Sequence, residues 1–119
     1  MKKVLPFLLV LYLLSGCNEE KSAPVVSTSP NGHIKITITG KRENSLSPWS
    51  LQMLAEAKGL KGNVNIDFYG SEVSDKTISF VWEKDQSCTI TLTEKDKTQR
   101  IFQFIPNGAD AMWKDLSPK

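Results

Sequence analysis

The sequence is poor in the side chains that most catalytic and metal sites require. Its 119 residues include one histidine, His33, and two cysteines, Cys17 and Cys88. A histidine metal site or a nucleophilic triad requires several such groups close together. The glycines stand singly, so the chain also lacks a glycine-rich phosphate-binding loop. We therefore expect a protein that is not an enzyme and that has neither a metal ligand set nor a cofactor.

The chain also lacks an excess of one charge. It contains 15 basic and 13 acidic residues, and Lys2 and Lys3 both lie within residues 1–16. Without that segment 13 basic and 13 acidic residues remain, and Lys41 and Arg42 form the only adjacent basic pair. Nucleic-acid binding depends on clustered positive charge. The composition thus predicts no nucleic-acid partner.

The apolar run near the N-terminus, residues 4–14, is too short to be a transmembrane helix. A helix needs about 20 apolar residues to span a bilayer. The run follows two lysines and ends in the small residues Ser15 and Gly16, which is the pattern of a secretory signal peptide. Within it, Leu14-Ser15-Gly16-Cys17 resembles the lipobox of bacterial lipoproteins.

This resemblance implies where the protein resides. In that class the chain is cut between Gly16 and Cys17, and Cys17 carries fatty acyl chains that hold the mature protein on a membrane. Asn18 follows Cys17. An aspartate there would favour retention in the inner membrane, so we expect the outer membrane, facing the periplasm, rather than the inner membrane.

The remaining chain is long enough for one domain. Residues 18–32 are polar, contain two prolines and have no apolar periodicity. This composition is typical of a flexible linker. We therefore expect a lipidated N-terminus and tether at 17–32 and a single β-rich domain at 33–119.

Alternating apolar and polar residues predict β-strands along the domain. The strands fall within five segments: 33–40, 63–70, 77–83, 87–94 and 99–105. The repeated Glu-Lys-Asp at 83–85 and 94–96 predicts two solvated hairpin turns. The fold class is therefore mainly β, an antiparallel sheet or a small sandwich of five to six strands, with a meander over 77–105.

The inward faces of these strands predict the hydrophobic core. Their fourteen apolar side chains are Ile34, Ile36, Ile38, Val64, Ile66, Phe68, Ile78, Phe80, Trp82, Cys88, Ile90, Leu92, Phe102 and Phe104. Because Cys17 is assigned to the lipid, Cys88 has no partner for a disulfide. A buried cysteine behaves as a small apolar side chain, which is the role that we expect for Cys88.

Two segments have an ambiguous pattern. Residues 48–58 contain strong helix formers after Ser47 and Pro48, which favours a helix, but alternate apolar residues from Leu51 also fit a strand. Residues 109–116, with Met112 and Trp113, predict a last short helix or strand.

Three side chains are candidates for contact with a partner: Trp49, Tyr69 and Val81. Tyr69 and Val81 point away from the predicted core, whereas for Trp49 packing in the core is favoured over exposure on the surface. We expect a non-catalytic envelope lipoprotein whose β domain binds another envelope or periplasmic protein. The alternatives are a structural or assembly factor of an envelope complex and a carrier of a small ligand.

Overall fold

The computed structural model describes residues 19–58, 60–107 and 110–118, and this part of the chain is all-β, without a helix. Its strands are β1 (Glu20–Lys21), β2 (Val25–Thr28), β3 (Lys35–Arg42), β4 (Trp49–Ala57), β5 (Leu60–Phe68), β6 (Ile78–Glu83), β7 (Ser87–Thr93), β8 (Gln99–Asn107) and β9 (Asp110–Asp115). The prediction of a mainly β fold is confirmed.

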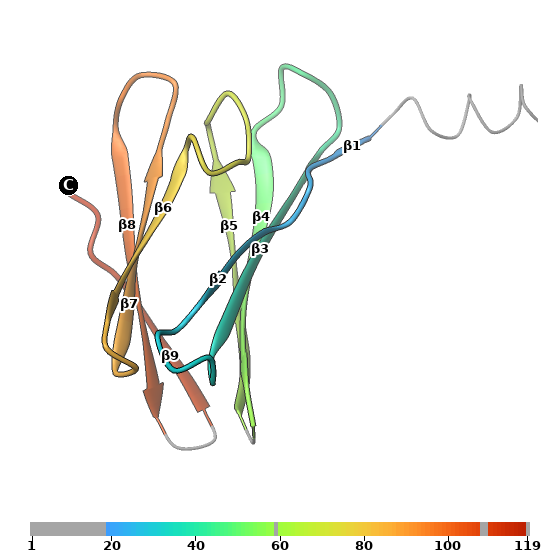
Figure 1. Cartoon of the computed structure of the whole chain (residues 1–119). Coiled ribbons are helices and arrows are strands. Elements are labelled where there is room, and N and C mark those ends of the chain that lie inside the picture. The colour runs from blue at the N-terminus through green and yellow to red at the C-terminus, as the bar shows by residue number, and fades with distance from the viewer. Residues whose placement is uncertain (1–18, 59, 108–109, 119) are drawn as a thin grey trace, which may run out of the picture.

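The strands form two antiparallel sheets that pack as a small sandwich-like domain (Figure 1). Sheet A has the order β1-β3-β4-β5, and β2 pairs with the same strand as β1, namely β3. Sheet B has the order β6-β7-β8-β9. Sheet B contains the predicted meander, with turns at 84–86 and 95–97.

The core lies between the two sheets. Ten of the predicted inward side chains are buried, and Val64, Ile66, Phe80 and Trp82 are partly buried against them. The core also contains five residues that the sequence analysis did not assign to it: Trp49, Leu51, Met53, Ala55 and Val73.

Residues 48–58 take the strand form, the second of the two forms that the sequence left open, and not the helix that local propensity favours. They form β4, in which Trp49, Leu51, Met53 and Ala55 are buried and alternate with more exposed residues. At about 100° per residue a helix would turn these four side chains in different directions, whereas a strand puts them on one face. β4 also pairs along its length with both β3 and β5, and this pairing outweighs helix propensities of tenths of a kcal/mol per residue.

Part of the segment predicted as a tether pairs with sheet A. Residues 20–21 and 25–28 lie in sheet A, so the domain begins well before residue 33. The sequence analysis missed these two strands because strands of two and four residues, on either side of Pro24, are too short to show an apolar period. Their backbone N–H and C=O groups are satisfied by pairing with β3.

Contacts between the sheets close both sides of the sandwich. On one side β5 lies against β9, where Gly62 faces Ala111. On the other side the Trp82 Nε1–H of β6 donates a hydrogen bond of 2.9 Å to Ser27 Oγ of β2. The C-terminal segment at 109–116 is thus mainly the strand β9, one of its two predicted forms.

Candidate binding surfaces

The structure does not bring the three predicted partner residues together. Trp49 is only 6% exposed and packs in the core under the Arg42 guanidinium, so it offers no exposed ring. Tyr69 and Val81 are 58% and 64% exposed, respectively. Tyr69 follows β5, and its carbonyl oxygen accepts a hydrogen bond from Lys95 N. Val81 lies instead on the outer face of sheet B, away from Tyr69 in the fold.

The outer face of sheet B carries little charge. By strand alternation its charged residues are Glu83, Asp110 and Lys114. The corresponding face of β3, β4 and β5 carries Lys35, Lys41, Glu56, Lys61 and Asp67. Because strongly hydrated charges oppose burial, the outer face of sheet B is the easier of the two to cover with a partner.

Five aliphatic side chains lie on this face, and together we call them the aliphatic face: Ile101, Ile105, Met112 and Leu116 on β8, on β9 and just after it, and Val81 on β6, which Thr89 of β7 separates from β8. Ile105 pairs with Met112 across β8 and β9, and Leu116 N donates to the Ile101 carbonyl oxygen at 2.7 Å. Between these two pairs, Gln103 lies opposite Lys114. Four of the aliphatic side chains therefore flank a polar pair, and Val81 lies in the same row as that pair, beyond Thr89.

The aliphatic face is open in the described part of the chain. Met112 is 40% exposed and Leu116 50% exposed, while Ile101 and Ile105 are half-buried by their neighbours in the sheet. The sequence indicated the aliphatic face only indirectly, because segment 99–105 is apolar on both faces. That pattern is typical of a strand in mid-sheet or between layers, and β8 lies between β7 and β9.

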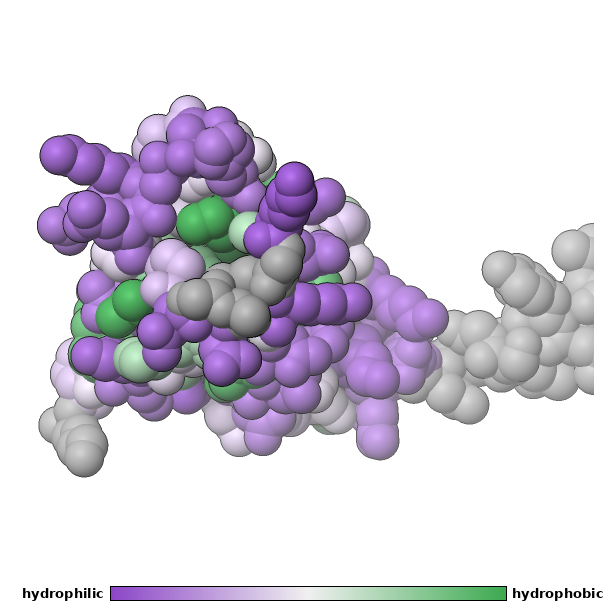
Figure 2. Space-filling model, turned by 90° about the horizontal axis from the view of Figure 1, so that it is seen from below, coloured by the Kyte–Doolittle hydropathy of each residue, from purple (hydrophilic) through white to green (hydrophobic). Residues whose placement is uncertain are grey.

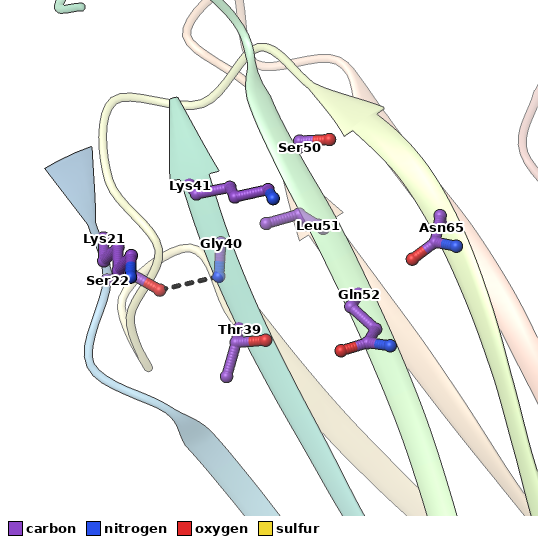
Figure 3. A pocket seen from close by; sticks show the side chains of 9 residues that line it. All are labelled: Lys21, Ser22, Thr39, Gly40, Lys41, Ser50, Leu51, Gln52 and Asn65. Carbon is purple, nitrogen blue, oxygen red and sulfur yellow. Dashed lines mark hydrogen bonds between the residues drawn. The ribbon is translucent and has the colours of Figure 1, made fainter. Parts of the chain in front are cut away.

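Sheet A has a polar groove on its outer surface, with a volume of about 390 Å³. Thr39, Gln52 and Asn65 lie side by side across β3, β4 and β5, and Lys21 and Lys41 lie at one end (Figure 3). Hydroxyl and amide groups both donate and accept hydrogen bonds, and a lysine ammonium donates them. The groove can therefore hold a polar or anionic group.

Cys88, a potential nucleophile, is fully buried, and desolvation raises the pKa of its thiol to about 12. The thiol is therefore protonated at neutral pH and unreactive. Within the described residues no three His, Cys, Asp or Glu side chains lie together as a metal ligand set would require. The exposed His33 has no such neighbours there.

Comparisons with known proteins identify no relative. No family model, curated protein or solved structure matches this chain. Across residues 19–58, 60–107 and 110–118 no helix is long and apolar enough to cross a membrane. The predicted cleavage site at Gly16 and the predicted lipid attachment at Cys17 lie outside the described residues.

Proposed function

We propose that this protein is a membrane-anchored envelope lipoprotein whose β domain binds another envelope or periplasmic protein without catalysis. The lipobox-like Leu14-Ser15-Gly16-Cys17 supports the anchor and the periplasmic side of the outer membrane as its location. The observation that carries the binding role is the aliphatic face. The cores of protein interfaces are depleted in charged side chains, and exposed apolar patches mark such sites.

The binding role is tested by cross-linking the lipidated protein in intact envelopes, purifying it and identifying its partners by mass spectrometry. Val81→Lys and Met112→Lys each place an ammonium group on the aliphatic face. Val26→Lys is the matched control, because Val26 is also an exposed valine, 50% exposed on β2 of sheet A. All three changes are at exposed positions and leave the core intact.

We expect one dominant partner whose recovery falls about tenfold or more with Val81→Lys or Met112→Lys and is unchanged with Val26→Lys. Equal recovery with all variants would place the partner elsewhere on the domain. Recovery of a large complex at fixed stoichiometry would favour the alternative role as an assembly factor.

The anchor is tested separately. Cys17→Ala removes the thiol to which the proposed lipid is first attached, so fatty-acid labelling disappears and an unprocessed precursor accumulates. Normal processing of the Cys17→Ala chain would refute the lipoprotein assignment.

The polar groove supports a second candidate function, the carriage of a small polar or anionic ligand. Thr39, Gln52 and Asn65 supply hydrogen-bonding groups in one row, and Lys41 adds a positive charge. Native mass spectrometry of protein isolated from envelopes tests this role. A ligand retained by the native chain and lost with Gln52→Ala plus Asn65→Ala would support it, and ligand-free native protein would count against it.

A further inference from the structure

We propose that the end of the sandwich formed by β1 and the β3–β4 loop, residues 43–48, rests on the bilayer surface, with Leu46 in the interfacial layer. This inference depends on the proposed acylation of Cys17. It names the lipid surface itself as the occupant of this end of the domain. It also gives the domain a fixed orientation instead of a free position on a long tether.

The length of chain between the anchor and sheet A sets the first constraint. β1 begins at Glu20, so only residues 18–19 separate it from Cys17. Three residue steps extend to about 10 Å at most. The polar layer on each side of a bilayer has a similar thickness, roughly 5–8 Å. An acylated Cys17 therefore holds the start of β1 close to the headgroups.

β1 and the segment after it are fastened to the sheet. Ser22 N donates to the Gly40 carbonyl oxygen, and Gly40 N donates to Ser22 Oγ, each at 2.8 Å. Arg42 forms an ion pair of 2.9 Å with Glu20. These contacts prevent residues 20–22 from acting as a spacer, so while they persist only the short segment before β1 separates sheet A from Cys17.

The β3–β4 loop lies at the same end of the domain as the entering chain (Figure 1). Glu20 pairs with Arg42, the last residue of β3, and the loop follows directly. Leu46 in this loop is 96% exposed. A singly exposed leucine is common on proteins, so its exposure alone decides nothing; its place beside the anchor is what makes it a membrane contact.

The loop has a defined turn. The Asn44 Oδ1 atom accepts hydrogen bonds from Leu46 N at 2.9 Å and from Ser47 Oγ at 3.3 Å. The Asn44 carbonyl oxygen also accepts one from Ser47 N. This asparagine-centred turn projects Leu46 from a fixed support, which reduces the entropy lost when its side chain enters the interface.

This end of the sandwich has no excess of basic residues. Residues 19–21 and 41–48 carry three acidic residues, Glu19, Glu20 and Glu43, and three basic residues, Lys21, Lys41 and Arg42. The β5–β6 and β7–β8 connections at the same end (Figure 1) add four acidic residues, Glu72, Asp75, Glu94 and Asp96, and three basic residues, Lys76, Lys95 and Lys97. Attraction to anionic lipids requires an excess of basic residues near the surface. Docking therefore depends on the lipid anchor and Leu46, and we expect it to be equal on neutral and anionic bilayers.

The opposite end of the sandwich is a poorer membrane contact. Seen from below, this end shows mostly hydrophilic residues with a few separated apolar ones (Figure 2). It carries the turn at 84–86, where Asp85 accepts a hydrogen bond from Asn31 N. We therefore expect this end to face away from the bilayer.

Fluorescence quenching in vesicles tests the orientation of the mature, lipidated protein. Ser45→Cys and, separately, Gln86→Cys supply a thiol for the same dye, because both native residues are exposed. The buried Cys88 does not react, and the lipid occupies the Cys17 thiol. The vesicles contain phosphatidylcholine with headgroup-depth doxyl lipids, with or without phosphatidylglycerol. Mass spectrometry first establishes that Cys17 is acylated.

We expect strong quenching at position 45, little at position 86 and no effect of phosphatidylglycerol. Adding Leu46→Ser to the Ser45→Cys protein should lower the ratio of docked to undocked domain about tenfold. Val26→Ser, which removes a 50% exposed apolar side chain from β2, is the control and should leave quenching unchanged.

Equal quenching at positions 45 and 86 in an acylated protein would overturn the docked orientation and leave the lipoprotein assignment intact. An unacylated Cys17 would refute the lipoprotein assignment and would also remove the premise of the docked orientation. Loss of partner capture with Val81→Lys, by contrast, has no bearing on quenching at position 45, so the binding role and the orientation fail independently.

Discussion

The Arg42 guanidinium lies 4.2 Å above the centroid of the Trp49 ring. The same guanidinium forms hydrogen bonds through Nε and Nη2 with Glu20 Oε2, so it links β1 to β3 and to the edge of the core. Trp49 is therefore buried by a cation that also holds the first strand of the domain. This arrangement explains why an aromatic residue predicted to contact a partner is covered.

The first prediction concerns this linkage. Arg42→Ala should release β1 and raise the hydrogen-exchange rate of the Ser22 amide several-fold, because that amide is bonded to the Gly40 carbonyl in the paired state. Global stability should fall by only about 1 kcal/mol, since an exposed ion pair and a cation–π contact are each worth less than that. NMR measures the exchange rate of the Ser22 amide, and thermal unfolding measures the loss of global stability.

Lys21→Ala is the control, because the Lys21 ammonium group forms an exposed contact of 3.9 Å with Glu19. It should leave the exchange of the Ser22 amide unchanged. An Arg42→Ala protein with native exchange at Ser22 would show that backbone pairing alone holds β1.

Much of the fold follows from the sequence because a half-buried strand has a period of two. The five predicted strands and their inward residues are confirmed, as in β3, where Ile36 and Ile38 are fully buried. The pattern was ambiguous at β4 because leucine, methionine and glutamine favour helices locally. The deciding factor was pairing with β3 and β5, which a local pattern does not contain.

The candidate surfaces were less predictable. Alternation correctly put Val81 on an outer face, but whether Tyr69 and Val81 are neighbours depends on which sheet each strand joins. The burial of Trp49 depends on Arg42, seven residues earlier. The pairing of Ile105 with Met112 depends on the register of β8 and β9. These relationships arise from tertiary structure and have no local sequence signal.

The second prediction concerns the buried thiol of Cys88. Its pKa is raised to about 12 by burial, well above the ordinary thiol value of 9.0. The unfolded chain loses this proton first as the pH rises, so the thiol should make the folded state progressively less stable between about pH 9 and pH 12. Denaturant titrations across this range should show a smaller decline for Cys88→Ala than for the native chain.

At neutral pH, Cys88→Ala should cost about 1 kcal/mol, because it removes a small buried group and leaves a small cavity. A polar thiol reagent should label the native protein only at its unfolding rate. Rapid labelling under native conditions would contradict the core position of Cys88.

The third prediction concerns the hydrogen bond between the sheets. Ser27→Ala leaves the Trp82 indole N–H without its partner and should cost about 1 kcal/mol of unfolding free energy. In a Trp82→Phe background the same change should be nearly neutral, because the donor is already absent. A double-mutant cycle in urea measures the coupling between the two residues, and strictly additive losses would show that the bond contributes nothing.

The fourth prediction concerns the closest approach of β5 and β9. A Cβ atom on Gly62 would lie 2.5 Å from the Ala111 Cβ, which is far inside van der Waals contact. Neither methyl group can rotate away, so Gly62→Ala must separate the strands and should cost about 1–3 kcal/mol. Ala111→Gly in the Gly62→Ala protein should restore part of the loss, since a single methyl group then fills the space.

The control for this prediction is Ala111→Gly alone, which should lower stability by up to about 1 kcal/mol because glycine weakens a strand. If the Gly62–Ala111 contact closes this side of the sandwich, the protein that carries both substitutions loses less stability than the two single variants lose in total. Equilibrium unfolding in urea measures the free energy of unfolding of each variant. Losses that simply add would mean that β5 and β9 have room to separate. The closed side of the sandwich would then be held by the surrounding core and not by this pair.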